Sequence, residues 1–366
     1  MTESLAAIFE GTAGEVVLRR VALPEPRDGE YLVRVLGCTL CGSDLHSFDG
    51  RRSVPVPTIL GHEIVGEIVA CGPSASKVDL AGSALQPGDR VTWAIVASCG
   101  NCFFCLRDLP QKCQRAVKYG HEPLQPGREL LGGLAEHCLL VAGTAIIKLT
   151  DLPLSVACPA SCATATIAAA IEAAGPIRDR SICIFGAGML GLTACAMARS
   201  LGATRIVCVE PNPSRRERAQ KFGATDVVDA KDLFALTRET GILEGFDAVL
   251  ELSGASAAFD VAWPLIRTGG VLVLVGSVFP TPPVSIALEQ VVRRHLTIRG
   301  IHNYSPRHLK MAVEFLTGAH RTFPFAELVT EWIPLVDIES AFARAMDPGV
   351  IRIGVAPGSR SSSDAS

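Results

Sequence analysis

Short alternating segments fill the first part of the chain, and longer apolar segments fill the second. Before about residue 150, the runs 31–36, 64–70 and 90–93 are bounded by Gly, Pro and Asp, which predicts β-strands joined by turns. From residue 181 onward, apolar runs alternate with stretches of helical periodicity. This alternation is typical of a parallel sheet covered by helices on both faces, so we expect an α/β fold behind a mainly β region.

The apolar runs of the second part give its predicted elements. They predict strands at 181–185, 205–209, 246–252, 271–275 and 296–299, a helix after the first strand to about residue 201, and one more helix at 306–316 before mixed short segments. The closing residues 358–366 are small and polar, which predicts a disordered tail.

Composition narrows the class of protein. The 366 residues allow two domains, and 48% hydrophobic with 19% charged residues excludes a disordered chain. No apolar run approaches the roughly 18 residues that cross a bilayer, so we expect no membrane association. The net charge of -3 is spread without blocks, so we expect no nucleic-acid partner. The first ten residues lack the features of a secretion signal, which predicts a cytoplasmic protein.

Thirteen cysteines in such a chain favour metal ligation over disulfides. Cys99, Cys102, Cys105 and Cys113 stand at i, i+3, i+6 and i+14. Four thiolates that converge on one point form a closed tetrahedral zinc shell, which leaves no position for a substrate. The alternative is a set of buried or oxidised cysteines. The pattern predicts a structural zinc lobe at about 96–115.

A second group of metal-binding residue types is more scattered. Cys41 is followed 21 residues later by His62, and Glu63 comes next. Three protein ligands plus water describe a catalytic zinc site, so a third ligand is needed. Cys162 is a candidate, although spacing alone does not identify it. By itself this constellation is as compatible with coincidence as with function.

A glycine-rich turn follows the strand at 181–185. The run Gly186-Ala187-Gly188-Met189-Leu190-Gly191 stands between an apolar strand and an apolar helix. Its glycines permit a tight turn, a close approach to a pyrophosphate and close packing of helix on strand, with the phosphates at the helix N-terminus. Glu210 ends the next strand and can accept hydrogen bonds from both ribose hydroxyls, which favours NAD over NADP. Arg215 and Arg216 lie just beyond, where a basic group accommodates a 2'-phosphate, so NADP stays open.

The chain resembles the zinc-dependent medium-chain alcohol dehydrogenase family over nearly its whole length. The resemblance lies in the order of four features: the open zinc site, the four-cysteine lobe, the glycine turn and the acidic residue Glu210 after the next strand. The runs 61–66 and 132–136 are similar to that family's zinc signature and to its sequence after the lobe. The resemblance implies a GroES-like catalytic domain, 1–163 and 301–366, and a Rossmann NAD-binding domain, 164–300. It further implies two zinc ions per chain and a homodimer or homotetramer.

The resemblance also assigns roles by position. Cys41, His62 and Cys162 would hold the catalytic zinc, with Glu63 as an exchangeable ligand and Asp44 as the residue that orients His62.

Ser43 and His46 match the proton-relay positions of the family. Zinc lowers the pKa of a hydroxyl toward about 7, and the released proton needs a path to solvent. Ser43 as a turn hydroxyl and His46 as an exposed loop side chain are the alternatives. Gly42 replaces the basic residue that several relatives use to contact the pyrophosphate, and Arg352 matches a family position that can supply this charge.

Two segments bear on the substrate. Arg51 and Arg52 follow His46 and suit an anionic alcohol, unless they belong to a solvated loop. His302 and Asn303 are expected to complete a polar pocket. Both segments resemble a subgroup associated with phosphonate breakdown, which makes a hydroxyalkylphosphonate a specific hypothesis. The segment 118–121 is interpreted as a surface loop, with a position at the border of the cleft as the alternative.

The sequence therefore predicts a zinc-dependent oxidoreductase that transfers hydride between an alcohol and NAD. A neutral polyol or threonine-type dehydrogenase is the first alternative, and a catalytically inert cofactor-binding protein is the second. A dimer formed through a sheet edge near 271–275 is the simplest assembly.

Overall fold

The computed structural model of the chain describes residues 2–239, 241–242 and 244–358. Its contacts divide the chain into two units. The first unit comprises the described residues of 1–165, 305–320 and 325–366, and the second comprises those of 166–304 and 321–324. The predicted tail at 358–366 lies outside the described residues except for Gly358.

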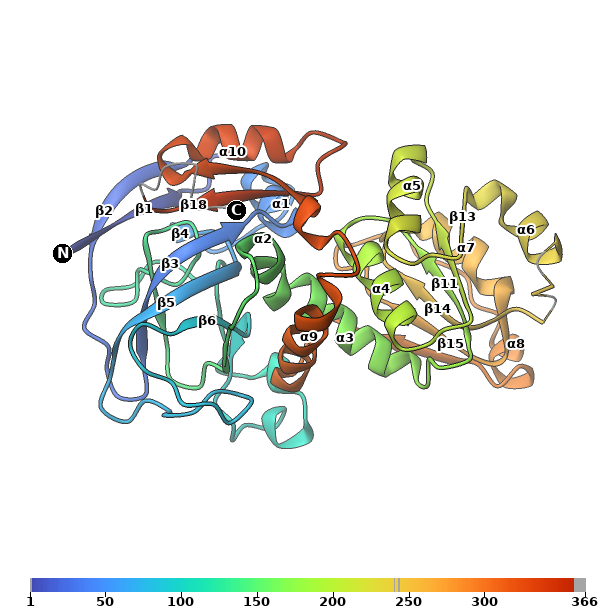
Figure 1. Cartoon of the computed structure of the whole chain (residues 1–366), viewed down its shortest axis with the longest axis horizontal. Helices are drawn as coiled ribbons and strands as arrows, with labels where there is room; N and C mark the ends of the chain where they lie inside the picture. Colours follow the sequence, from blue (N-terminus) through green and yellow to red (C-terminus); the bar gives the residue numbers. More distant parts are fainter. Residues whose placement is uncertain (1, 240, 243, 359–366) are drawn as a thin grey trace. The chain divides into compact units, whose positions relative to one another are not determined.

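The first unit is mainly antiparallel β-structure (Figure 1). Its sheets have the strand orders β2-β1-β4, β10-β6-β5-β3-β18-β17 with β9 also paired to β3, and β7-β8. The strands are β1 Glu3–Phe9, β2 Val17–Ala22, β3 Tyr31–Thr39, β4 Thr58–Ile59, β5 Glu63–Cys71, β6 Arg90–Trp93, β7 Val96–Ala97, β8 Val117–Lys118, β9 His137–Leu140, β10 Ile146–Lys148, β17 Val329–Pro334 and β18 Arg352–Ala356. The helices are α1 Gly42–Phe48, α2 Leu154–Ala157, α9 Pro306–Ala319 and α10 Ile338–Ala345.

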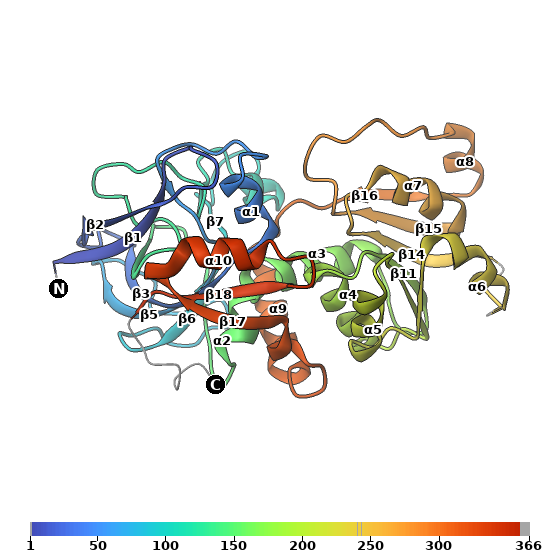
Figure 2. The same ribbon diagram turned by 90° about the horizontal axis from the view of Figure 1, so that it is seen from above.

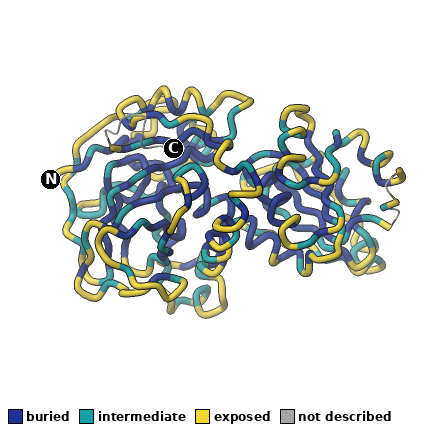
Figure 3. The backbone as a smooth tube through the Cα atoms, in the orientation of Figure 1, coloured by how far each residue is buried: buried dark blue, intermediate teal, exposed yellow. Residues whose placement is uncertain are grey.

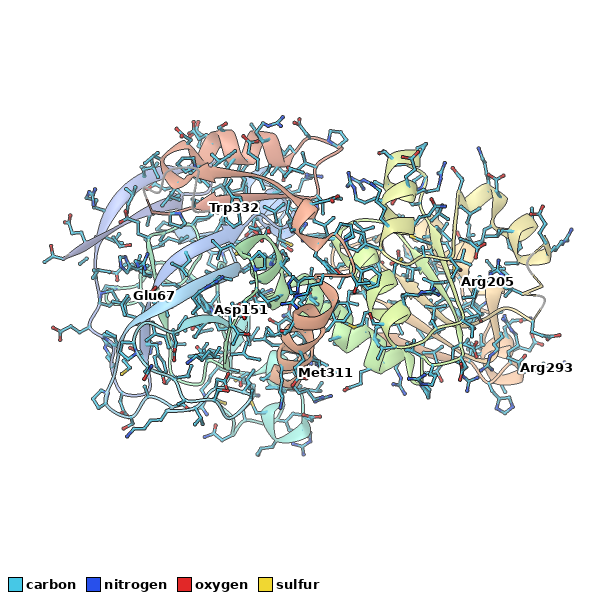
Figure 4. The ribbon with its side chains drawn as sticks, in the orientation of Figure 1. Glu67, Asp151, Arg205, Arg293, Met311 and Trp332 are labelled. Carbon is cyan, nitrogen blue, oxygen red and sulfur yellow. The ribbon has the colours of Figure 1, made fainter. Side chains whose placement is uncertain are left out.

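The pairing of β3 with β5 fixes the centre of this unit. Alternate side chains of both strands are buried in one core, and Figure 3 shows the central strands as largely buried tube. On the partly exposed side, Arg34 of β3 and Glu67 of β5 are register partners and form an ion pair at 3.0 Å, with Glu67 labelled in Figure 4. Burial of one face specifies the register, because a one-residue slip would turn the apolar side chains outward.

The second unit is a six-stranded parallel sheet of order β13-β12-β11-β14-β15-β16, which is the doubly wound topology. Figure 2 shows α4 and α5 on one side of this sheet and α7 and α8 on the other. The strands are β11 Ser181–Phe185, β12 Arg205–Val209, β13 Asp226–Val228, β14 Phe246–Glu251, β15 Ile266–Leu274 and β16 Thr297–Gly300. The helices are α3 Ala163–Ala174, which begins at the end of the first unit, α4 Met189–Ser200, α5 Pro213–Lys221, α6 Leu233–Glu239, α7 Ser256–Ala262 and α8 Leu288–Arg293.

The predicted fold class, a mainly β GroES-like region with a parallel-sheet cofactor region, is confirmed. One detail of the sequence interpretation is wrong. The segment 271–275 is not at a sheet edge, because β15 pairs with β14 on one side and with β16 on the other. Among the described strands, β16 is the edge strand at that end. Strand order is a tertiary property, and the apolar pattern of a parallel strand does not reveal it.

Short 3₁₀ helices connect several elements. They are Cys105–Arg107, Pro110–Lys112, Cys158–Ser161, Ala230–Asp232, Trp263–Leu265, Phe325–Leu328 and Leu335–Asp337. No single helix in the described part of the chain is long and apolar enough to cross a membrane. Two successive helical segments, Leu154–Ser161 and Ala163–Ala174, are together long and apolar enough for a membrane span, but the chain bends by 54° between them.

Candidate metal and cofactor sites

The register of three strands assembles the first site. Thr39 ends β3 and is paired with Glu63, which begins β5, so the residues just outside this pair meet. Those residues include Cys41, which follows β3, and His62, which precedes β5. β18 runs antiparallel along the other side of β3 with Gly354 opposite Thr39. The same register places Arg352 opposite Cys41.

Cys162 joins this site from another part of the chain. It follows the 3₁₀ helix Cys158–Ser161, and Ser161 Oγ donates a hydrogen bond to the His62 carbonyl oxygen at 3.2 Å. The Sγ atoms of Cys41 and Cys162 are 3.9 Å apart, and the ligand atoms of Cys41, His62 and Cys162 all lie within 4.8 Å of one another. Two sulfurs bound to one tetrahedral zinc at about 2.3 Å would be roughly 3.8 Å apart. The geometry therefore fits zinc with a fourth position left open.

Asp44 holds the two segments together. Its Oδ2 accepts a hydrogen bond from the Cys41 amide at 2.9 Å, and its Oδ1 accepts one from the Gly61 amide at 3.0 Å. The same Oδ1 is 3.2 Å from His62 Nδ1. Since a carboxylate only accepts, Nδ1 carries the proton and Nε2 is left for the metal. The predicted contact between Asp44 and His62 is present, and Asp44 is 1% exposed.

We expect Asp44→Asn to weaken binding of the catalytic zinc by about 10- to 100-fold. An amide cannot accept all three hydrogen bonds, so His62 loses its orientation. Competition with a zinc chelator measures the loss. Asp49→Asn is the matched control, because Asp49 stands at the opposite, C-terminal end of the same helix and pairs with Arg51. Equal zinc affinity in Asp44→Asn and the wild type would contradict this role.

Charges and hydrogen bonds around the site shift the pKa values of its ligands in opposite directions. Hydrogen bonding from Cys162 lowers the pKa of the Cys41 thiol well below its usual value despite burial, and the charge of Arg352 acts in the same direction. Burial alone would lower the pKa of His62, but the Asp44 carboxylate and Cys41 outweigh burial and raise it to about 10. Zinc must therefore displace a proton from the imidazole, which makes zinc affinity depend on pH.

Glu63 and Arg352 form a buried ion pair beside these ligands. Arg352 donates from Nε and Nη2 to the two carboxylate oxygens of Glu63 at 2.9 and 3.0 Å, and Thr39 Oγ1 donates to Oε2 at 2.6 Å. Arg352 Nη2 also lies 3.6 Å from Cys41 Sγ. Both residues thus stand at the zinc site. The roles of Glu63 as an exchangeable ligand and of Arg352 at the pyrophosphate stay predictions.

The four cysteines of the lobe converge as the sequence predicts. The Sγ atoms of Cys99 and Cys113 are 3.4 Å apart, and Cys102 Sγ lies 3.5 Å from Cys105 Sγ and 3.8 Å from Cys113 Sγ. Together with the 4.0 Å between the Sγ atoms of Cys99 and Cys105, these separations bracket the spacing of roughly 3.8 Å expected for a tetrahedral zinc thiolate site. Backbone amides of Cys99 and Arg115 donate hydrogen bonds to Cys113 Sγ.

The glycine turn of the second unit has the predicted shape. Gly186 has a φ of +98°, and a Cβ on Gly191 would lie 1.8 Å from the Gly186 carbonyl oxygen, so both positions require glycine. A Cβ on Gly188 would meet nothing within 4 Å, which leaves open space at the N-cap of α4. The amides of Met189 and Leu190 begin that helix and suit a pyrophosphate.

Glu210 follows β12 and is buried against this turn. Its Oε2 accepts a hydrogen bond from the Ala187 amide at 2.8 Å, and its Oε1 accepts one from the Asn212 amide at 3.0 Å. Arg216 Nη1 donates to the carbonyl oxygens of Glu210 and Pro211. The N-cap of α5 is Asn212, whose side-chain oxygen accepts a hydrogen bond from the Arg215 amide. The carboxylate is thus fixed beside the phosphate-binding turn.

The comparisons with known proteins identify the family. Residues 27–151 match the model of the alcohol dehydrogenase GroES-like domain, and residues 190–318 match that of the zinc-binding dehydrogenases. An L-threonine 3-dehydrogenase of Coxiella burnetii is 31% identical over 337 residues, which cover 89% of this chain and 91% of the relative. The 5-exo-hydroxycamphor dehydrogenase of Pseudomonas putida is 29% identical over 323 residues, 85% of this chain and 87% of that protein.

A solved structure of an alcohol dehydrogenase has the same fold as this chain. The crystal structure of an alcohol dehydrogenase from Thermotoga maritima superposes with a TM-score of 0.91 at 27% identity and covers 97% of this chain and 100% of that one. The chain belongs to the zinc-containing medium-chain alcohol dehydrogenase family. It is a zinc-dependent dehydrogenase with a structural four-cysteine zinc site and a catalytic Cys-His-Cys zinc site.

The predicted relay and substrate residues are distributed over both units. Ser43 and His46 lie three residues apart on α1, and burial, followed by the charge of Arg51, lowers the pKa of His46. His302 and Asn303 follow β16 and belong to the second unit, so their place in a substrate pocket stays a prediction.

The interpretation of 118–121 as a surface loop is wrong. Lys118 ends β8 and is half-buried, and His121 is buried with its ring centroid 5.3 Å from that of His62. No sequence motif marks these two residues. The adjacent residues Arg51 and Arg52 have different environments. Arg51 is ion-paired with Asp49 and its side chain is 64% exposed, whereas Arg52 is half-buried.

Proposed function

We propose that the protein oxidises a primary or secondary alcohol, or reduces the corresponding carbonyl compound, with NAD as the hydride carrier. The observation that carries this proposal is the convergence of Cys41, Cys162 and His62, with an open fourth position, in a chain that also carries a dinucleotide turn. When bound, zinc supplies Lewis-acid polarisation of the substrate oxygen, and the nicotinamide accepts hydride. We place the catalytic role in residues 1–163 and 301–366 and cofactor binding in residues 164–300.

In this proposal, α1 carries the proton from the site. Ser43 would take the alcohol proton first, and His46 would release it to solvent. The cofactor, when bound, would supply the ribose hydroxyls between these two residues. Residues three apart on a helix share a face, which supports this order. The lowered pKa of His46 keeps its imidazole neutral and able to accept a proton near pH 7.

The preference for NAD rests on Glu210. Its buried carboxylate is fixed beside the glycine turn, where it suits ribose hydroxyls and opposes a 2'-phosphate. Arg216 supports this preference, because its guanidinium is engaged by backbone carbonyls.

The proposed substrate is an anionic alcohol of the hydroxyalkylphosphonate kind. The second candidate is a threonine-type or neutral polyol dehydrogenase, which the names of several relatives favour. We also propose a homodimer or homotetramer, since Leu288 and Val292 of α8 are 75% and 73% exposed in the single chain.

A substrate screen tests the proposal. Zinc-loaded protein is assayed with NAD and with NADP against 1-propanol, 3-hydroxypropanoate, 2-hydroxyethylphosphonate, a polyol and L-threonine, by following reduced-cofactor absorbance. We expect kcat/KM to be about tenfold or more higher with NAD than with NADP, a difference of roughly 1.4 kcal/mol. The anionic alcohols should be oxidised better than 1-propanol. Turnover restricted to L-threonine or the polyol would favour the second candidate, and a preference for NADP would contradict the role of Glu210.

A further inference from the structure

Two cationic side chains near the catalytic zinc ligands have no anionic partner. The side chains of Arg52 and Lys118 form no ion pair or hydrogen bond with any residue in the described ranges, although both are half-buried. The Lys118 amide donates to Glu122 Oε1 at 2.7 Å, so that carboxylate is engaged by backbone. Other charged residues of this unit at similar burial, such as Arg34 and Lys148, are paired with acids.

The two cations stand on segments that reach the zinc ligands. Arg52 is hydrogen-bonded to α1, whose N-cap is Cys41, and the Lys118 carbonyl oxygen accepts a hydrogen bond at 3.1 Å from the amide of His121, whose ring lies 5.3 Å from that of His62. Burial lowers the pKa of Lys118 to about 8, and the nearby charges of Arg52 and Lys112 act in the same direction. The charges of Asp44, Cys41 and Cys162 reach Arg52 and oppose its desolvation. When the metal balances the sulfur charges, the Asp44 carboxylate is the one of these three groups that still acts on Arg52, and its oxygens are already engaged by Cys41, Gly61 and His62. Buried like charges are costly unless an anion pairs with them.

His121 adds an independent observation at the same place. Its Nδ1 lies 2.9 Å from the Tyr119 carbonyl oxygen, which only accepts, so Nδ1 carries the proton. Its Nε2 is buried and has no hydrogen-bond partner among the described residues. The ring is 7% exposed and lies against His62. A buried acceptor without a partner indicates that a further molecule completes the site.

We propose that Arg52 and Lys118 form an anion-binding subsite that holds the carboxylate, phosphate or phosphonate group of the substrate beside the catalytic zinc. Arg52 is positioned by α1, since its amide donates to the His46 carbonyl oxygen at 2.8 Å, and Lys118 is positioned by the pairing of β8 with β7. A guanidinium and an ammonium can share the oxygens of one anion. Nε2 of His121 accepts a hydrogen bond from a hydroxyl of the same substrate or from an ordered water.

The proposal assigns anion binding to Arg52 and not to the adjacent Arg51. Arg51 is exposed and already neutralised by Asp49, so it has little charge to offer a ligand. The subsite also rests on the proposed function, because it presumes that the substrate's hydroxyl group lies at the zinc. The experiment must therefore distinguish failure of the subsite from failure of the enzyme activity.

Steady-state kinetics with variants provide that distinction. Arg52→Gln, Lys118→Gln and Arg51→Gln are compared with the wild type on 1-propanol, 3-hydroxypropanoate and 2-hydroxyethylphosphonate. Zinc content and circular dichroism verify that each variant is loaded and folded. We expect the ratio of KM for an anionic alcohol to KM for 1-propanol to rise by about 10- to 100-fold in Arg52→Gln and in Lys118→Gln. Arg51→Gln should change this ratio less than about twofold. Lys118→Arg keeps the positive charge, so its ratio should stay close to that of the wild type. The lower KM among the two anionic alcohols identifies a carboxylate or a phosphonate as the preferred group.

Each result decides one of the two claims. A ratio within about twofold of wild type in both Arg52→Gln and Lys118→Gln, or an equal effect of Arg51→Gln, would overturn the subsite and leave the dehydrogenase proposal intact. Zinc-loaded protein that oxidises no alcohol would contradict the dehydrogenase proposal instead. In that case calorimetry with methylphosphonate tests the subsite alone. Binding by the wild type that is lost in Arg52→Gln supports the subsite. Equal binding by the wild type and Arg52→Gln, or no binding by the wild type, overturns it.

Discussion

Cys162→Ser is expected to remove the catalytic zinc and to lower kcat/KM by about a thousandfold or more. Its sulfur lies 3.9 Å from that of Cys41, and these two sulfurs and His62 form the group of ligand atoms that converges at this site in the described part of the chain. A hydroxyl at position 162 stays protonated and binds zinc poorly. The lost Lewis acid is worth several kcal/mol of transition-state stabilisation, and each 1.4 kcal/mol is a factor of ten in rate.

The measurements are zinc content and turnover in parallel. Wild type should hold two zinc ions per chain and Cys162→Ser one, with NAD binding retained because the cofactor turn lies elsewhere in the sequence. Cys71→Ser is the matched control, since Cys71 is an exposed cysteine outside both metal groups. Two zinc ions and near-normal turnover in Cys162→Ser would refute the assignment of this ligand.

Cys113→Ser is expected to have the largest effect on stability, through local unfolding of the lobe. The two 3₁₀ helices of the lobe are one turn each, and Phe103 and Leu106 are 54% and 71% exposed. The lobe therefore has little apolar core. A structural zinc contributes on the order of 10 kcal/mol to small zinc-binding domains, more than such a segment gains from packing. Without the fourth thiolate we expect the chain between Cys99 and Cys113 to lose its fold.

Limited proteolysis with zinc analysis checks this expectation. In Cys113→Ser, cleavage should appear within residues 96–115, and one zinc should remain at the catalytic site. Cys71→Ser should be as resistant as the wild type. Resistance to cleavage together with two retained zinc ions in Cys113→Ser would show that packing, rather than the metal, holds the lobe.

Local patterns in the sequence predicted five of the six strands of the parallel sheet, but only three of the strands of the first unit. Strands at 90–93, 181–185 and 205–209 have the predicted bounds, because an apolar run between turn residues is a local signal. The four cysteines of the lobe and the glycine turn are likewise compact in sequence, so their spacing carries the geometry.

Features that depend on strand order were not predictable. Arg352 is 289 residues from Glu63, and the two meet because β18 adds to the free side of β3. The same limitation explains the wrong placement of 271–275 at a sheet edge. Lys118 and His121 looked like loop residues, because burial next to His62 depends on how the segment after the lobe folds back on the first unit. Cys162 was found through family resemblance and not through spacing.

The most direct test of the account is anomalous diffraction at the zinc absorption edge from crystals of the zinc-loaded protein. We predict two peaks per chain. One should lie about 2.3 Å from the Sγ atoms of Cys41 and Cys162 and about 2.0 to 2.1 Å from His62 Nε2, and the other should lie among the four cysteines of the lobe. A single peak at the lobe, with the sulfur of Cys162 turned away from Cys41, would contradict the catalytic site on which the proposed function depends.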